Sequence, residues 1–263
     1  MRGRVLVIAG SDSGGGAGIQ ADIKAIMAMG GYSASAVTAI TAQNTLGVHL
    51  VHSVPPDVVQ AQIEAVLHDI GADAIKVGML GDTATVLRVA DCLVRLAAGI
   101  PIVVDPVMVA KGGQSLLAIE ALQALREGLL PIATLITPNL PEAQCLLGRP
   151  IVKAADAARE LLRTGTKAVL LKGGHGEGTE LTDVLADSDG LQSFTMPRIE
   201  TRHTHGTGCT LASAIAAGLA QGMTLHASIG RARRYVQEAI SGAPGFGAGH
   251  GPLNHNVGTS YDG

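Results

Sequence analysis

The 263-residue sequence is poor in aromatic and charged residues, and both shortages exclude classes of function. It has three tyrosines, two phenylalanines and no tryptophan, so it lacks the stacking platforms that bind single-stranded nucleic acid. Charged residues make up 16%, against about 25% in an average protein, and the net charge is −3. Binding to nucleic acid needs a clustered surplus of lysine and arginine, so we expect no nucleic-acid partner.

Long apolar runs and paired cysteines are also missing. No apolar run reaches the roughly 18 residues of a membrane-spanning helix, so we expect no membrane association. The N-terminal run Val5–Ile8 is too short for a signal peptide. Cys92, Cys145 and Cys209 are far apart and form no C-x-x-C pair, which argues against a disulfide framework or a structural zinc site. A cytoplasmic location fits these absences best.

Strand-like apolar runs alternate with segments of helical spacing along the whole chain. This alternation predicts an α/β fold in which helices cover both faces of a mainly parallel sheet, a three-layer α/β/α arrangement. The strands are expected over 4–9, 32–41, 74–77, 101–105, 134–137 and 167–172. The helices are expected over 19–29, 55–70, 83–96, 116–125, 139–147, 154–164, 209–221 and 225–241.

Two further β runs, 182–186 and 191–196, flank an Asp-Gly turn and predict a small antiparallel hairpin. We find no domain boundary and no internal repeat. The sequence therefore predicts one domain over 1–263, with an ordered core over about 4–256 and a tail at 257–263, and the stretch from Gly242 onward is rich in glycine and proline.

Ligands of parallel sheets lie beyond the carboxyl ends of the strands, and the polar motifs of this sequence fall there. The glycine-rich loop Gly10–Gly18 contains Asp12 and leads to Asp22. Glycines let a ligand approach the backbone closely, although a plain strand-to-helix turn is the alternative. Gln43 follows the second strand, and its amide can pair with the edge of a nitrogen heterocycle or belong simply to a polar loop.

The middle strands are followed by two apolar residues, by a pair of oxygen-bearing side chains and by a lysine. Met79 and Val107 can line an apolar pocket or pack in the core. Asn139 and Glu142 match a helix capping box, and their oxygens also suit a hydrated magnesium ion. Lys172 leaves a buried strand into a glycine turn, where it can meet phosphate or remain solvated.

The strongest motif, His203-Thr-His-Gly-Thr-Gly-Cys209, opens a helix of small residues. The N–H groups at the start of a helix bind anions, and Gly206 and Gly208 let them face a ligand. Cys209 lies in the first turn, where we expect its pKa to fall, although a buried cysteine packed among alanines is the alternative. His203 and His205 have no third ligand nearby, so we do not interpret them as a metal site.

Taken together, five motifs resemble the hydroxymethylpyrimidine/phosphomethylpyrimidine kinases of the ribokinase-like superfamily. The likeness covers residues 4 to about 256 and includes Gly249-His-Gly-Pro-Leu-Asn254. The motifs are Ala9-Gly-Ser-Asp-Ser-Gly-Gly-Gly-Ala-Gly-Ile-Gln-Ala-Asp22, Thr41-Ala-Gln-Asn-Thr45, Lys76-Val-Gly-Met-Leu80, Asp105-Pro-Val-Met-Val-Ala-Lys-Gly-Gly113 and His203-Thr-His-Gly-Thr-Gly-Cys209.

The resemblance implies two reactions that use ATP and Mg²⁺. The hydroxymethyl group of 4-amino-5-hydroxymethyl-2-methylpyrimidine is phosphorylated first, and the monophosphate then becomes the diphosphate. It also implies a homodimer. The implied substrate contacts are Gly10, Asp12, Asp22, Gln43, Met79 and Val107. The implied catalytic group is the anion hole Gly206, Thr207 and Gly208 with Cys209 as base. Lys172, Thr207 and Asn139 are implied on the ATP phosphate side, and Asp105 and Glu142 at the metal.

Other functions stay open on the sequence alone. A kinase for pyridoxal or pyridoxine shares much of the pattern. A covalent thiol enzyme would use Cys209 as nucleophile, and a non-catalytic protein would bind the heterocycle without releasing ADP. The glycines around Lys111-Gly-Gly113 would permit a flap over the site.

Overall fold

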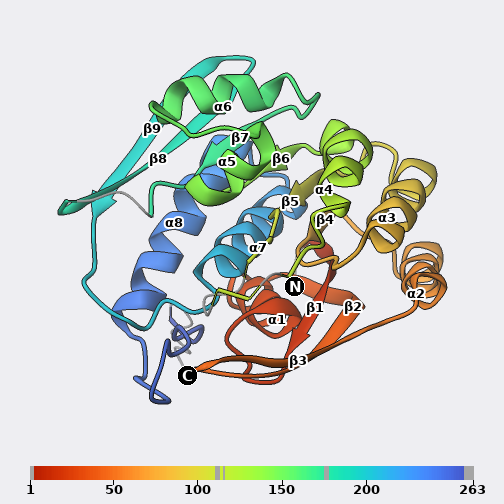
Figure 1. The fold of residues 1–263 in the computed structure, drawn as a ribbon, viewed down its shortest axis with the longest axis horizontal. Coiled ribbons are helices and arrows are strands. Elements are labelled where there is room, and N and C mark those ends of the chain that lie inside the picture. Colours follow the sequence, from red (N-terminus) through yellow and green to blue (C-terminus); the bar gives the residue numbers. More distant parts are fainter. Residues whose placement is uncertain (1–2, 110–112, 115, 175–177, 258–263) are drawn as a thin grey trace.

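The computed structural model describes residues 3–109, 113–114, 116–174 and 178–257. The region around Lys111 and most of the expected tail therefore lie outside the described residues. In the described part of the chain, nine strands join one sheet in the order β3-β2-β1-β4-β5-β6-β7-β8-β9 (Figure 1). The strands are β1 (Arg4–Asp12), β2 (Tyr32–Asn44), β3 (Gly47–Ser53), β4 (Ala74–Val77), β5 (Ile102–Val104), β6 (Leu135–Ile136), β7 (Val169–Leu171), β8 (Glu180–Asp187) and β9 (Gly190–Pro197).

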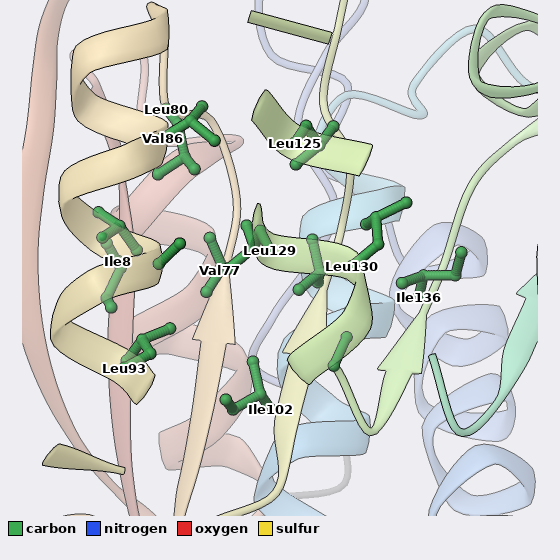
Figure 2. Packing of buried hydrophobic residues seen from close by; sticks show 14 of the residues in the cluster. Ile8, Val77, Leu80, Val86, Leu93, Ile102, Leu125, Leu129, Leu130 and Ile136 are labelled. Atoms are coloured by element: carbon green, nitrogen blue, oxygen red, sulfur yellow. The ribbon is translucent and has the colours of Figure 1, made fainter. Parts of the chain in front are cut away.

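Helices cover both faces of this sheet, as the alternation of elements predicts. They are α1 (Gly18–Ala28), α2 (Pro56–Asp69), α3 (Thr83–Leu96), α4 (Ala121–Ala124), α5 (Leu140–Leu147), α6 (Ala154–Leu162), α7 (Thr207–Ala220) and α8 (Leu225–Ser241). Two cores result, because successive residues of a strand point to opposite faces. In β1, Leu6 and Ile8 belong to the core on the side of α2, α3 and α6, whereas Val5 and Val7 belong to the core on the side of α1, α7 and α8. Figure 2 shows part of the first core.

The six central strands, β2 to β7 in sheet order, run parallel, and the pairings at both edges are antiparallel. The predicted hairpin is confirmed as β8 and β9. It is not separate, because β8 pairs with β7 and so extends the central sheet. Because the hairpin continues the sheet, residues of β8 and β9 also line the cavity that is described below.

Two sequence-based assignments are wrong. The edge strand β3 was not predicted, since the expected polar loop after Gln43 is instead a tight turn into Gly47–Ser53. The helix expected over 116–125 begins only at Ala121, and a π-helical turn at Leu125–Leu129 and a 3-10 turn at Leu130–Ile132 follow it. Leu125, Leu129 and Leu130 are all buried, so packing of these leucines onto the sheet sets the local geometry (Figure 2).

Capping groups set the starts of three helices. Asp82 accepts a hydrogen bond from the Thr85 N–H at 2.8 Å at the start of α3, and Thr224 caps α8 in the same way. Asn139 and Glu142 form the predicted capping box of α5. Within the described residues, no helix has the length and apolar character needed to cross a membrane.

Candidate functional site

A cavity of about 780 Å³ lies at the carboxyl ends of the parallel strands. Nearly every residue predicted for the site lines it, although these residues come from distant parts of the sequence. The lining residues among them are Gly10, Asp12, Gln43, Met79, Asp105, Val107, Asn139, Glu142, Lys172, Gly206, Thr207, Gly208 and Cys209. Asp22 is the one predicted residue that does not line the cavity.

The N-terminus of α7 is held against the glycine-rich loop by a very close backbone contact. Gly206 has a φ of +83°, and a Cβ at this position would lie 1.7 Å from the Gly16 carbonyl oxygen. No residue other than glycine fits there. The contact directs the first turn of α7 to the cavity, where the N–H groups of Gly208 and Cys209 have no helical acceptor.

Cationic side chains lie next to this helix start. A Cβ on Gly208 would lie 3.2 Å from the Lys172 Nζ atom and 3.3 Å from an Asp105 carboxylate oxygen. Lys172 itself donates to Asp105 at 2.8 Å. The helix N-terminus and the ammonium therefore converge on one region of the cavity, which suits an anion such as a phosphoryl group.

Cys209 lines the cavity, but its thiol does not have the predicted low pKa. Burial raises the pKa of Cys209 to about 12 and outweighs the opposing effect of the Lys76 ammonium. The expectation of a ready thiolate is therefore wrong for the ligand-free protein. The helix dipole favours the thiolate, but loss of hydration costs more in this enclosed position.

The carboxylate of Asp22 is fully buried and engaged by two side chains. It accepts hydrogen bonds from Lys76 Nζ at 2.8 Å and from Ser213 Oγ at 2.7 Å. The predicted direct substrate contact by Asp22 thus disagrees with the structure. Ser213 lies one helical turn after Cys209, so Asp22 instead places the Lys76 ammonium beneath the start of α7.

Lys76 is a site residue that sequence reasoning missed. It is completely buried in β4 and also lines the cavity. Burial alone would lower the pKa of Lys76, but the negative groups around it, Asp22 first, raise it above its usual value. A lysine in the middle of the apolar strand Ala74–Val77 is a signal that could have revealed it, since an unpaired buried lysine is rare.

Asp12 stabilises the glycine-rich loop and is joined to His205. Its carboxylate accepts hydrogen bonds from the backbone N–H groups of Gly14, Gly16 and Ala17, and from His205 Nε2 at 2.8 Å. Burial alone would raise the pKa of Asp12, but the hydrogen bonds from His205 and the backbone lower it. Asp12 therefore both lines the cavity and holds the glycine-rich loop in its conformation.

Asp105 and Glu142 are the two carboxylates predicted for a metal. Thr137 donates to Asp105 at 3.0 Å, and Lys172 Nζ lies 2.8 Å from Asp105 and 3.9 Å from Glu142. Burial raises the pKa of Glu142 to about 7, against the attraction of Lys172. The oxygen donors fit a magnesium ion that keeps several waters and also binds a ligand phosphate. Within the described residues, no cluster of three or more acidic, histidine or cysteine side chains could hold a metal alone.

The cavity that Gln43 lines is also lined by apolar side chains. Met79 and Val107 both line it, and a Cβ on Gly10 would lie 3.0 Å from the Met79 sulfur. Gly10 therefore leaves room for Met79 at the wall. The combination of apolar side chains and an amide in one cavity suits a small nitrogen heterocycle.

The fold and the site together define a class of protein. A mainly parallel sheet with helices on both faces, and a cavity between strand ends and one helix N-terminus, is the ribokinase-like arrangement. More narrowly, the chain belongs to the phosphomethylpyrimidine kinase family, a family of phosphotransferases that matches it over residues 12–254. This match confirms the family resemblance that the sequence motifs indicate.

Individual relatives agree with this assignment. The chain is 50% identical to a hydroxymethylpyrimidine/phosphomethylpyrimidine kinase of Rhizobium meliloti, over 95% of this chain and 96% of the relative. It is also 50% identical to the thiamine biosynthesis bifunctional protein ThiED of Geobacter sulfurreducens, covering 97% of this chain but only 52% of that protein. A solved structure of Bacillus subtilis pyridoxal kinase with ADP has a TM-score of 0.89 at 36% identity, covering 97% of this chain and 98% of that one.

We predict that Cys209 of the ligand-free protein reacts slowly with iodoacetamide near pH 8, because a thiol with a pKa of about 12 is almost entirely protonated. Raising the pH by one unit should increase its rate roughly tenfold, since the thiolate fraction grows tenfold per unit below the pKa. Peptide mass spectrometry over time measures this, with the exposed Cys145 as internal reference and Cys209→Ser as the blank. Labelling of Cys209 as fast as Cys145 at pH 7 would contradict the neutral thiol.

Proposed function

We propose that this protein transfers a phosphoryl group from ATP to the hydroxymethyl group of 4-amino-5-hydroxymethyl-2-methylpyrimidine, and then to the resulting monophosphate. The observation that carries the proposal is that one cavity is lined both by apolar side chains with the Gln43 amide and by the helix N-terminus at Gly206, which suits an anion. Near-complete coverage of a named hydroxymethylpyrimidine/phosphomethylpyrimidine kinase at 50% identity supports the choice of substrate.

In this proposal, the first turn of α7 and Lys172 stabilise the charge on the phosphoryl oxygens during transfer. Phosphoryl transfer depends mainly on positioning and electrostatic stabilisation, which preformed N–H groups and an ammonium supply. Thr207, Lys172 and Asn139 all line the cavity, and in this proposal they contact the ATP phosphates. The ADP bound in the pyridoxal kinase relative supports ATP as phosphoryl donor. Asp105 and Glu142 would hold Mg²⁺, which neutralises phosphate charge when bound.

Pyridoxal is the second candidate substrate, because a pyridoxal kinase shares the fold closely at 36% identity. The higher identity to the pyrimidine kinase ranks the pyrimidine first.

An ADP-release assay with the aminopyrimidine, its monophosphate and pyridoxal decides between these readings. We expect kcat/KM for the aminopyrimidine to exceed that for pyridoxal at least tenfold, because the Gln43 amide can pair with adjacent ring-nitrogen and amino groups. Preference for pyridoxal would reverse the assignment. Binding of a heterocycle without ADP release would indicate a non-catalytic sensor, and a mass increase on Cys209 without ATP would indicate a thiol enzyme.

We propose further that Cys209 accepts the proton of the substrate hydroxyl group. Cys209→Ala should then reduce turnover by about 10²–10⁴-fold, the usual contribution of a general base, and change ATP binding much less. Because only the thiolate can accept the proton, wild-type turnover should rise with pH from about 7 to 9, whereas residual turnover of Cys209→Ala should stay flat. Rates across this pH range, with ATP affinity from calorimetry, test both points. Unchanged turnover would remove Cys209 from the mechanism.

We propose a homodimer that forms through the edge of the sheet at β3. Leu46, Leu50 and Ile40 on the β2–β3 pair are 67%, 60% and 53% exposed, which is costly for a surface that stays free. Light scattering should give twice the 26.7 kDa chain mass, and Leu50→Lys should shift it to the monomer. Val152→Lys, on a residue 92% exposed and far along the chain, is the control. A wild-type monomer would contradict the proposal.

Three free cysteines are consistent with a cytoplasmic location.

A further inference from the structure

The amide of Gln43 lies between two polar groups on the cavity wall. Its Oε1 atom is 3.1 Å from the Thr41 hydroxyl oxygen, and its Nε2 atom is 3.2 Å from the His205 Nε2 atom. Rotation of the amide by 180° exchanges its oxygen and nitrogen and leaves the rest of the side chain in place. The hydrogen-bonding state of the two neighbours therefore decides which end of the amide faces which neighbour.

On one side, His205 must donate. Its Nε2 atom lies 2.8 Å from a carboxylate oxygen of Asp12, and Asp12 also accepts from the backbone N–H groups of Gly14, Gly16 and Ala17. A carboxylate that already accepts from three backbone N–H groups has no proton to give, so the His205 Nε2 atom is the donor and carries the proton. The amide group next to that proton can only be the oxygen, because two N–H groups would repel each other.

On the other side, Thr41 must accept. Its hydroxyl oxygen lies 3.0 Å from the carbonyl oxygen of Ser11, which has no proton to give. The single hydroxyl proton of Thr41 can go to only one acceptor, and we assign it to that carbonyl, which is nearer than the Gln43 atom at 3.1 Å. The contact between Thr41 and Gln43 is then a hydrogen bond only if the amide nitrogen faces the threonine. Two independent arguments thus select the same amide orientation.

Packing keeps His205 in place. The residue is only 8% exposed, and a Cβ on Gly16 would lie 2.5 Å from its ring carbon Cδ2. The backbone of His205 also pairs with Pro252 in the C-terminal segment. The imidazole therefore cannot turn away without displacing the glycine-rich loop.

We propose that Asp12, His205 and Thr41 form an orientation lock that fixes the Gln43 amide with its oxygen toward His205 and its nitrogen toward Thr41. All three are positioning residues, and the inference rests on the aminopyrimidine substrate of the proposed function. The locked amide offers the ligand one acceptor beside His205 and one donor beside Thr41. This pattern selects a ring that carries an amino group adjacent to an unprotonated ring nitrogen.

The lock also determines which way round the ring binds. The 4-amino group pairs with the amide oxygen on the His205 side, and ring nitrogen N3 pairs with the amide nitrogen on the Thr41 side. The hydroxymethyl group at C5 is next to the amino group, so it falls on the His205 side. His205 directly precedes Gly206, the N-cap of α7. The lock therefore points the reacting hydroxyl group toward the anion-binding helix start.

The test compares the 4-amino substrate with its 4-oxo analogue, in which N3 carries a proton and C4 an acceptor oxygen. This analogue has the reversed donor and acceptor pattern, so we expect the wild type to discriminate against it in kcat/KM on the order of 100-fold. Thr41→Val keeps the side-chain shape but frees one end of the amide. Discrimination should fall at least tenfold, mainly through KM, and Thr41→Ser should restore it.

Two further measurements do not depend on Thr41. His205→Gln replaces the fixed donor by a group that can donate or accept, and it should relax discrimination in the same direction. Nitrogen NMR of the ligand-free protein should show the Nε2 atom of His205 protonated at neutral pH, with His205→Gln used to assign the signal. This readout requires no activity.

The outcomes separate the two proposals. A wild type that phosphorylates neither pyrimidine contradicts the proposed function, and the NMR signal still decides the lock. If the wild type is active, equal discrimination in the wild type, Thr41→Val and His205→Gln overturns the lock, as does an unprotonated Nε2 atom. A drop in kcat for both pyrimidines with an unchanged ratio indicates a merely structural role and likewise overturns it.

Discussion

The site depends on the contact between two glycine segments, one after the first strand and one before the penultimate helix. Gly206 accepts a left-handed backbone conformation and leaves no space for a side chain against the Gly16 carbonyl. Because of this contact, the start of α7 meets the end of β1, although almost two hundred residues separate them in the sequence. Asp12 is then hydrogen-bonded to His205. The free N–H groups of the helix open into the same cavity that Met79 and Val107 line.

Buried charge is distributed around this contact in two pairs. Lys76 pairs with Asp22 beneath α7, and Lys172 pairs with Asp105 at the mouth of the helix. A buried lysine is tolerated only next to an opposite charge, so each carboxylate is needed to keep its ammonium in place. The cost is visible at Cys209, where burial keeps the thiol protonated despite the nearby ammonium. The cavity thus favours an incoming anion more than it favours a negative charge on its own sulfur.

Polar residues around Gln43 show how a scaffold can make a flexible group specific. An amide alone accepts either of two donor and acceptor patterns, since rotation exchanges its ends. Neighbours that can only donate or only accept remove that freedom. Asp12 performs this role indirectly, by fixing where the proton of His205 lies. In the proposed lock, the same residue therefore shapes the glycine-rich loop and also acts on ligand recognition through His205.

The sequence by itself determined the alternating α/β order, the capping box of α5, and a motif set specific enough to name a family. These features depend on local spacing and residue type, which the chain carries wherever it folds. It did not determine that Asp22 is buried under α7, that Lys76 joins the cavity, or that β3 completes an edge. The broken helix after Ala121 was likewise set by buried leucines packing onto the sheet. Burial and donor or acceptor state depend on neighbours brought together from distant strands, so only the tertiary structure decided the ionisation of Cys209 and the partners of Gln43 and Asp22.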